Sequence, residues 1–162
     1  MQGLAKEGTP RVGLAADHAG YDLKEIIGKD LRAAGYAVVD VGTHEPGHPD
    51  DYPDFAALMG EAFLQGRVER AIVVCGSGVG VSVALNKFPG VLAAVCHDTY
   101  SARQGVEHDN MNVLCLGSRI VGSELAKDIV KAFLAASFSG EERHVRRWKK
   151  VLEIERRFLK KE

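Results

Sequence analysis

The sequence predicts an α/β protein with a central five-stranded parallel sheet that carries helices on both faces. Short apolar, β-branched runs alternate along the chain with segments of helical periodicity. The run 71–74, Ala-Ile-Val-Val, is apolar on both faces, as in a parallel strand covered by helices on each side. The chain of 162 residues, 46% hydrophobic and 27% charged, is long enough for one domain with its own core.

The elements follow from the positions of apolar runs, glycines and prolines. Gly35 is expected to end the first helix, and Pro53 suits the first turn of the second. Leu125, Ile129 and Phe133 are expected on one apolar helix face. The strands are expected at 11–16, 36–41, 71–74, 91–95 and 112–117, and the helices at 21–34, 52–65, 79–87, 98–107, 122–137 and from 141 onward.

Composition bounds the compartment and the partners. Residues 1–10 have no apolar core, so we interpret them as a frayed extension rather than a secretory signal, and residues 11–162 as a single domain. No run approaches the roughly 18 apolar residues of a membrane span, and a net charge of −1 favours neither nucleic acid nor an anionic membrane. Three cysteines without paired spacing indicate a reducing compartment, so we expect a cytoplasmic protein.

The chain is organised around a glycine turn that follows the third strand. Cys75 ends the strand, and Gly76, Gly78 and Gly80 break its period before a helix of small residues begins. Strand, glycine turn and helix start present free backbone N–H groups to an anion. The spacing fits neither the dinucleotide fingerprint nor the P-loop. Ser77 and Cys75 lie within the turn, where a hydroxyl and a thiol can face the bound anion.

Cys75 has two interpretations. A cysteine at a strand end beside a helix start can have its thiolate stabilised and serve as a base or nucleophile. Alternatively, Cys75 is a small buried hydrophobic residue. We expect the second role for Cys96 and Cys115, which lie at or near other strand ends.

Asp17 and His18 follow the first strand, at the edge where open α/β sheets bind ligands. Asp17 either contacts a ligand or caps the following helix. In the loop 42–54, His44 and His48 with Asp50 and Asp51 could indicate a metal site, but nothing fixes their geometry, so we favour a solvated loop and no metal. Tyr52, after this loop, either lines the site or only packs the helix that it begins.

Basic residues crowd the C-terminal helix around an apolar stripe that includes Trp148. No strand remains to cover this stripe, which indicates packing across a subunit interface. Arg143 and Arg147 are four residues apart, hence on one side of the helix, and two guanidinium groups so placed can clamp a phosphate. Ser118 and Arg119 lie just beyond the carboxyl end of the fifth strand.

With these residues in view, the sequence resembles the sugar-phosphate isomerase family of ribose-5-phosphate isomerase B and the galactose-6-phosphate isomerase subunits. The likeness covers the chain from Arg11 to about Phe158. Several motifs in the right order are more specific than any one of them. They are Asp17-His18-Ala-Gly, Asp51-Tyr52-Pro53, Cys75-Gly-Ser-Gly-Val-Gly, Asn86-Lys87, Glu107-His108, Asn112-Val-Leu, Gly117-Ser-Arg119 and Arg143-His144-x-x-Arg147.

The resemblance implies a Rossmann-like three-layer α/β/α sandwich whose C-terminal helix packs on a partner subunit. It implies a homodimer, or a dimer of dimers, with active sites shared between subunits. The reaction implied is the interconversion of an aldose phosphate and a ketose phosphate through a cis-enediolate, without metal or nicotinamide cofactor. Ribose 5-phosphate is the leading substrate.

The resemblance also assigns roles to residues. Cys75 would move the proton between C2 and C1, Ser77 would handle the hydroxyl protons, and His108 would open the furanose ring. The amides of the turn from Gly76 through Gly78 to Gly80 would stabilise the enediolate oxygen. Further substrate contacts are implied for Asp17 at the sugar hydroxyls and for His18, Arg119, Arg143 and Arg147 at the phosphate, some of them from the partner subunit. One branch of the family uses a glutamate further along the turn, where this chain has Val81 and Ser82.

One position departs from the family pattern. Asp109 stands where many members have asparagine, and Asn110 follows it. A carboxylate beside an enediolate would repel it unless protonated or turned away. Either Asp109 contacts a substrate hydroxyl, or Asn110 takes over part of the role, or the substrate differs. The alternatives are a six-carbon sugar such as galactose or allose 6-phosphate, a tetrose phosphate, or a non-catalytic module that binds sugar phosphates.

Overall fold

The computed structural model describes residues 8–159. The predicted frayed extension therefore falls largely outside the described residues, as do 160–162. The five predicted strands form one parallel sheet in the order β2-β1-β3-β5-β4, which confirms the predicted fold class. The strands are β1 Arg11–Ala16, β2 Ala37–Asp40, β3 Arg70–Cys75, β4 Ala93–Val95 and β5 Val113–Gly117.

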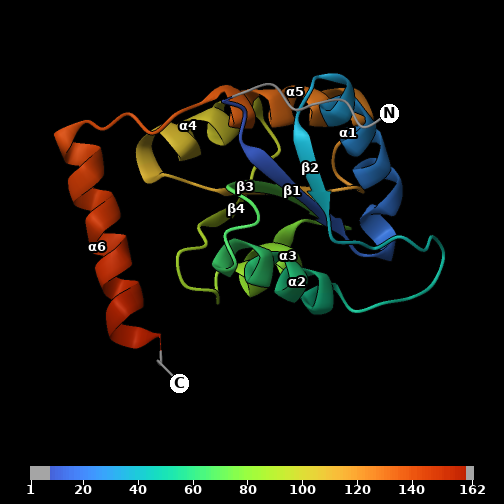
Figure 1. Cartoon of the computed structure of the whole chain (residues 1–162), viewed down its shortest axis with the longest axis horizontal. Helices are drawn as coiled ribbons and strands as arrows, with labels where there is room; N and C mark the ends of the chain where they lie inside the picture. The colour runs from blue at the N-terminus through green and yellow to red at the C-terminus, as the bar shows by residue number, and fades with distance from the viewer. Residues whose placement is uncertain (1–7, 160–162) are drawn as a thin grey trace.

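Helices cover both faces of this sheet. In Figure 1, α1, α4 and α5 lie on one side of the strands, and α2 and α3 lie on the other. Each side has its own apolar core of side chains, because alternate strand residues point to opposite faces. The helices are α1 Tyr21–Ala33, α2 Tyr52–Leu64, α3 Val79–Leu85, α4 Thr99–Asp109, α5 Ser123–Ala135 and α6 Glu142–Phe158, and a 3₁₀ turn, η1, covers His18–Gly20.

Two predicted details are wrong. Helix α4 continues to Asp109, so His108 lies in its last turn rather than beyond it, and left-handed Asn110 (φ 56°) ends the helix. Leu125 is exposed, because the stripe of α5 that packs on the sheet runs through Ala126, Ile129 and Phe133 instead. The element boundaries otherwise agree with the prediction to within about two residues, the usual uncertainty of helix and strand ends.

The topology places the glycine turn beside Asp17. From β1 the chain moves outward to β2 on one side, and from β3 it moves to the other side, so the strand order reverses between β1 and β3. The register pairs Ala16 with Val74, and the Asp17 backbone N–H donates to the Val74 carbonyl at 3.2 Å. Ligands of open α/β sheets bind at such a reversal, outside the carboxyl ends of the strands.

A buried charge pair that the sequence did not indicate joins α1 to β2. The ammonium group of Lys24 is fully buried and donates to the Asp40 carboxylate at 2.8 Å. The second oxygen of Asp40 accepts from the Gly42 N–H at 3.0 Å, and the Gly42 carbonyl in turn accepts from the Ala16 N–H at 2.7 Å. This network fixes the residue that precedes Asp17.

Arg70, the first residue of β3, holds the end of α5. Its guanidinium donates to the Phe133 and Ala136 carbonyls at 2.7 Å each and lies over the Phe133 ring. The last carbonyls of a helix have no partners within the helix, so these hydrogen bonds cap α5. Burial lowers the pKa of Arg70 below its usual value. The point where the chain leaves α5 toward α6 is therefore fixed by β3.

Helix α6 stands at the side of the molecule and contacts the body chiefly through α4 (Figure 1). Val151, Ile154 and Phe158 on this helix are exposed, whereas Val145, Trp148 and Leu152 are half-buried. Its apolar stripe is thus only partly covered within one chain. Over residues 8–159, no helix combines the length and apolar character that crossing a bilayer requires.

Candidate active site

The glycine turn holds the Cys75 thiol in place. Cys75 is only 4% exposed, and its Sγ accepts a hydrogen bond from the Gly78 N–H at 3.1 Å. Gly78 adopts φ 79°, a left-handed conformation that other residues rarely adopt, and this brings its N–H back toward the sulfur. The turn thereby fixes the sulfur with a backbone N–H donor aimed at it. Ser77 is exposed, and its Oγ accepts from the Val79 N–H at 3.2 Å.

The segment after β5 forms one wall of the turn. The Ser118 N–H donates to the Cys75 carbonyl at 2.8 Å, and the Arg119 N–H donates to the Gly76 carbonyl at 3.1 Å. The Arg119 guanidinium lies over Gly76, where a Cβ would be 3.1 Å from Nη1. The structure therefore brings Arg119 directly to the turn, as its position after β5 predicts. A cation there attracts an anion bound by the amides.

Tyr52 lies against the beginning of α3. A Cβ on Gly80 would be 2.8 Å from the ring carbon Cζ, so only a glycine lets the ring approach this closely. Tyr52 is the first residue of α2 and is 39% exposed. It therefore both packs two helices together and borders the turn, which combines the two roles that the sequence left open.

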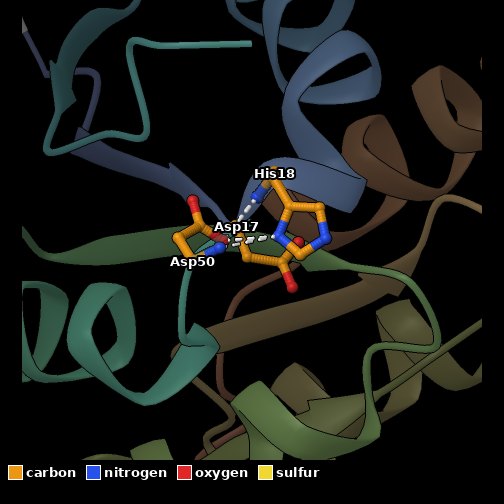
Figure 2. A group of neighbouring side chains, drawn as sticks. All are labelled: Asp17, His18 and Asp50. Carbon is orange, nitrogen blue, oxygen red and sulfur yellow. Dashed lines mark hydrogen bonds and ion pairs between the residues drawn. The ribbon is translucent and has the colours of Figure 1, made fainter. Parts of the chain in front are cut away.

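Asp17, His18 and Asp50 meet at the end of β1 (Figure 2). Asp17 is buried, and its Oδ1 accepts from the Gly20 N–H at 3.0 Å, so it caps the turn η1 as well as standing at the site. The Asp50 carboxylate accepts from the His18 N–H at 2.9 Å and pairs with His18 Nδ1 at 2.6 Å. Asp50 thereby orients the imidazole, a role that the sequence did not indicate.

The same three residues are the one group that could offer several metal ligands within the described chain. Their ligand atoms lie within 4.8 Å of one another. Yet the hydrogen bonds to His18 already engage Asp50 Oδ1, and Gly20 engages Asp17 Oδ1. The arrangement is thus that of a hydrogen-bonded pair beside a helix cap. His44 and His48, the other candidates of the loop, are exposed and do not join this group.

A second group of residues lies where α4 meets α6. The rings of His108 and His144 stack with centroids 4.0 Å apart and planes 22° from parallel. The Gln104 amide nitrogen lies 2.9 Å from His108 Nδ1, and the Ser139 hydroxyl lies 2.6 Å from His144 Nδ1. Burial and then the neighbouring positive charge of Arg143 lower the pKa of His144 below its usual value.

The remaining predicted substrate ligands lie near this second group or on the surface. Arg143 and Arg147 are exposed on the first turns of α6, and Arg143 pairs with Glu141 at 3.0 Å. Asp109 is exposed at the end of α4. Asn110 serves as the left-handed cap of that helix, so its backbone has a structural role.

The candidate site thus consists of two parts. The turn part contains Cys75 and Ser77 with Gly76, Gly78, Gly80, Tyr52, Arg119, Asp17 and His18. The arm part contains His108, Arg143 and Arg147 with Gln104 and His144. Among residues 8–159, no hydrogen bond, ion pair or ring contact joins the parts directly. Gln104 was not assigned to the site from the sequence, although a spacing of four residues on a helix would have indicated its contact with His108.

The other two thiols differ from Cys75 in their surroundings. Burial and the charge of Asp98 raise the pKa of Cys96 to about 11. Burial also raises the pKa of Cys115, whose side chain lies wholly within the core. Both thiols therefore stay protonated at neutral pH, as expected for the small buried hydrophobic residues that the sequence predicted. Cys75 alone of the three receives a backbone N–H.

Together, the fold and the site define an α/β protein in which a thiol, a glycine turn and cationic groups meet at the reversal of a parallel sheet. The chain belongs to the ribose/galactose isomerase family, whose model matches residues 12–151. The ribose-5-phosphate isomerase B of Escherichia coli is 42% identical over 147 residues, which cover 91% of this chain and 97% of that protein. The D-erythrulose-4-phosphate isomerase of Pectobacterium atrosepticum is 40% identical over 129 residues, covering 80% and 85%.

The fold is likewise shared with a solved structure that contains a sugar phosphate. Ribose-5-phosphate isomerase B from Mycoplasma genitalium with bound ribulose-5-phosphate superposes with a TM-score of 0.84 at 41% sequence identity. The match covers 90% of this chain and 96% of that one. The sheet, its helices and their order are therefore those of the family.

Proposed function

We propose that this protein interconverts ribose 5-phosphate and ribulose 5-phosphate by proton transfer through a cis-enediolate. The observation that carries the proposal is the hydrogen bond from Gly78 to Cys75 Sγ inside the turn. A proton next to a carbonyl is removed by a positioned base while donors stabilise the oxyanion that forms. Cys75 would supply the base, and the backbone amides of the turn would supply the donors.

The proton balance of the reaction needs no external oxidant. Cys75 as thiolate takes the C2 proton, the C1 carbonyl oxygen becomes an enediolate oxygen, and the proton returns to C1 as the C2 carbonyl forms. The exposed Ser77 hydroxyl would shuttle the proton between O1 and O2. Beforehand His108 would assist opening of the furanose, in which the C1–O4 bond breaks, O4 gains a proton and O1 loses one.

We also propose that two subunits share each site. Among residues 8–159, no hydrogen bond, ion pair or ring contact joins the turn part to the arm part, and α6 leaves an apolar stripe uncovered beside the arm. A homodimer that buries this stripe would bring Arg143 and Arg147 of one subunit to the turn of the other. With its three cysteines free and buried, the protein suits the reducing cytoplasm, where we place it.

The test of the function is turnover of ribose 5-phosphate in deuterium oxide without added metal. We expect ribulose 5-phosphate that carries solvent deuterium at C1, because the transferred proton resides on an exchangeable thiol. NMR of the product measures both yield and labelling. Tight binding of the sugar phosphate without any product would instead identify a non-catalytic binding module and contradict the proposal.

Sharing of the site predicts rescue between two inactive variants. Cys75→Ala removes the base of the turn part, and Arg143→Ala removes a cation of the arm part. Mixed dimers contain one site with both intact residues, so we expect about a quarter of all sites to be complete after random exchange of equal amounts. Activity of the unfolded and refolded mixture, compared with each variant refolded alone, measures this rescue.

The control for rescue is a pair of variants within one part. A mixture of Cys75→Ala and Arg119→Ala should recover activity only if the two residues reach one site from different subunits. Arg119 lies over Gly76, the residue next to Cys75 in the same chain, so we assign both to one subunit. Every turn in this mixture lacks either Cys75 or Arg119, so we expect no complete site and no recovered activity. The mixture of Cys75→Ala with Arg143→Ala should therefore be more active than the control mixture. Equal rescue, or none with heterodimers verified by mass spectrometry, would contradict sharing by the arm.

A tetrose phosphate is the second candidate substrate. The exposed Asp109, where asparagine is usual, and a relative that is named a D-erythrulose-4-phosphate isomerase favour testing it. The two substrates differ by one carbon between the carbonyl and the phosphate. Comparison of kcat/KM for the five-carbon and four-carbon phosphates decides between them.

A further inference from the structure

Gln104 and His108 are one helical turn apart on α4, so their side chains lie on the same face. The amide nitrogen of Gln104 lies 2.9 Å from His108 Nδ1. An amide nitrogen only donates hydrogen bonds, so Nδ1 must accept and cannot carry a proton. A neutral imidazole holds its single proton on the other ring nitrogen, here Nε2. This side-chain contact therefore selects a tautomer.

A second residue, His144, fixes the plane of the His108 ring by stacking on it. His144 stacks on it at 4.0 Å, is 1% exposed, and is itself bound through Nδ1 to the Ser139 hydroxyl. The Ser139 N–H donates to the Glu107 carbonyl at 2.9 Å, which ties the segment before α6 to α4. Stacking fixes the plane of an imidazole but leaves the choice of protonated nitrogen open. Gln104 makes that choice.

We propose that Gln104 is a positioning residue that holds His108 as the neutral Nε2–H tautomer, so that His108 presents a hydrogen-bond donor to the ring oxygen of the substrate. The inference rests on the proposed function, in which His108 assists ring opening. Among the described residues His108 Nε2 makes no hydrogen bond, which leaves this N–H available to a ligand.

The chemistry of ring opening fits a neutral donor. As the C1–O4 bond breaks, its electron pair goes to O4, and the O1 hydroxyl loses its proton while the C1 carbonyl forms. A water molecule can carry that proton from O1 to O4, so the step is balanced without net uptake or release. The Nε2–H of His108 stabilises the charge that develops on O4, as neutral histidines do in other isomerases.

The surroundings explain why an amide suits this position better than a carboxylate. Glutamate at 104 would accept from Nδ1, place a proton there and favour the doubly protonated ring. The His108 ring stacks on His144, whose pKa the charges of Arg143 and Arg147 help to lower. A charged His108 would place a further positive charge against the buried, stacked His144, whereas the neutral ring fixed by Gln104 donates a hydrogen bond without that cost.

The tautomer is tested directly by ¹⁵N NMR of protein labelled at histidine, with His108 assigned from the signal lost in His108→Gln. We expect the wild type to show a protonated Nε2 and an unprotonated Nδ1 at neutral pH. Gln104→Glu should move the proton onto Nδ1, and Gln104→Met, similar in length but without a donor, should give a mixture of tautomers. Gln65→Met, the same change at an exposed helix end, is the control and should leave His108 unchanged.

Two activities on one pair of substrates separate ring opening from proton transfer. Turnover of ribose 5-phosphate requires both steps, whereas exchange of a C1 proton of ribulose 5-phosphate with solvent deuterium requires only the second, because this ketose is open-chain. In Gln104→Met we expect turnover to fall about tenfold to a hundredfold, somewhat less than complete removal of an oxyanion donor costs, because His108 itself remains. The rate at which a C1 proton of ribulose 5-phosphate exchanges with solvent deuterium should fall by a severalfold smaller factor than turnover of ribose 5-phosphate.

The outcomes separate this inference from the proposed function. Equal loss of both activities in Gln104→Met would make Gln104 merely structural, and a His108 tautomer unaffected by Gln104→Glu would overturn the assignment outright. If the wild type turns over no sugar phosphate, the proposed function fails. The NMR result still decides whether Gln104 selects the tautomer, because that measurement needs no substrate.

Discussion

Replacement of Cys75 by alanine is expected to lower kcat for ribose 5-phosphate by about 10²- to 10⁴-fold, the usual contribution of a positioned proton-transferring group. The variant loses the proposed base and leaves the Gly78 N–H without its partner, while the arginines that would bind phosphate stay in place. KM should therefore change far less than kcat. Steady-state kinetics with both sugars, alongside exchange of the C1 proton of ribulose 5-phosphate, measures the effect.

Cys96→Ala provides the matched control for this prediction. It removes the same sulfur from a second buried cysteine, whose pKa is raised by burial and which lies in the core on the opposite face of the sheet. We expect Cys96→Ala to be modestly less stable than the wild type. Its activity should stay within a few-fold of the wild-type activity. A Cys75→Ala variant as active as Cys96→Ala would reject Cys75 as the base and return it to the role of a buried hydrophobic residue.

Gly78→Ala is expected to destabilise the protein by about 2–5 kcal/mol, because left-handed strain and overpacking add. The added Cβ would lie 3.0 Å from the Leu116 carbonyl carbon and 3.2 Å from the Gly117 nitrogen, both of them backbone atoms that cannot rotate away. Any relaxation also moves the N–H away from Cys75 Sγ. Urea unfolding measures the first effect, and kcat measured well below the unfolding transition measures the second.

Gly66→Ala separates strain from crowding. Gly66 also has a positive φ, 66°, but a Cβ there would meet nothing within 4 Å. It should therefore cost only the left-handed penalty of about 1–2 kcal/mol and leave kcat unchanged. If Gly78→Ala were no less stable than Gly66→Ala and equally active, the close packing of the turn against β5 would be irrelevant to the site.

The fold could be predicted because its signals are local. Apolar runs such as 71–74 are short and bounded by charge or glycine, so the strand positions follow from periodicity and length alone. The solvent position of Leu125 was not predictable in this way. Which residues at the edge of an apolar stripe are covered depends on how α1 and α4 pack beside α5, and the sequence of one helix does not contain that information.

The turn part of the site was predictable for a similar reason. Cys75, Ser77 and the glycines are consecutive, and Asp17 and Arg119 follow strands that end at the same edge of the sheet. Asp50 was not assigned to His18, because the pair is 32 residues apart and joined by a loop without periodicity. The stacking of His108 on His144 likewise depends on the position of α6, which is set by packing rather than by local sequence.

The departure from the family pattern at Asp109 and Asn110 falls at the end of α4. Asn110 ends α4 in a left-handed conformation, a common use of asparagine, so its identity has a structural explanation independent of the substrate. The carboxylate of Asp109 is exposed at that helix end. A substrate contact from Asp109, a shared role for the Asn110 side chain and a changed substrate all stay predictions, and Asp109→Asn is the informative substitution for substrate preference.

Strand β3 links the candidate base to the segment that leads into α6. Its last residue is Cys75, and its first, Arg70, grips the carbonyls at the end of α5 from which the segment 136–141 departs. At about 3.3 Å per residue, the strand sets these two residues roughly 17 Å apart. Insertions or deletions in 136–141 would therefore shift Arg143 and Arg147 while the thiol stays where it is. If these arginines bind the phosphate as proposed, substrate length and reaction chemistry would change as separate traits, one through a surface connection and the other through a buried strand.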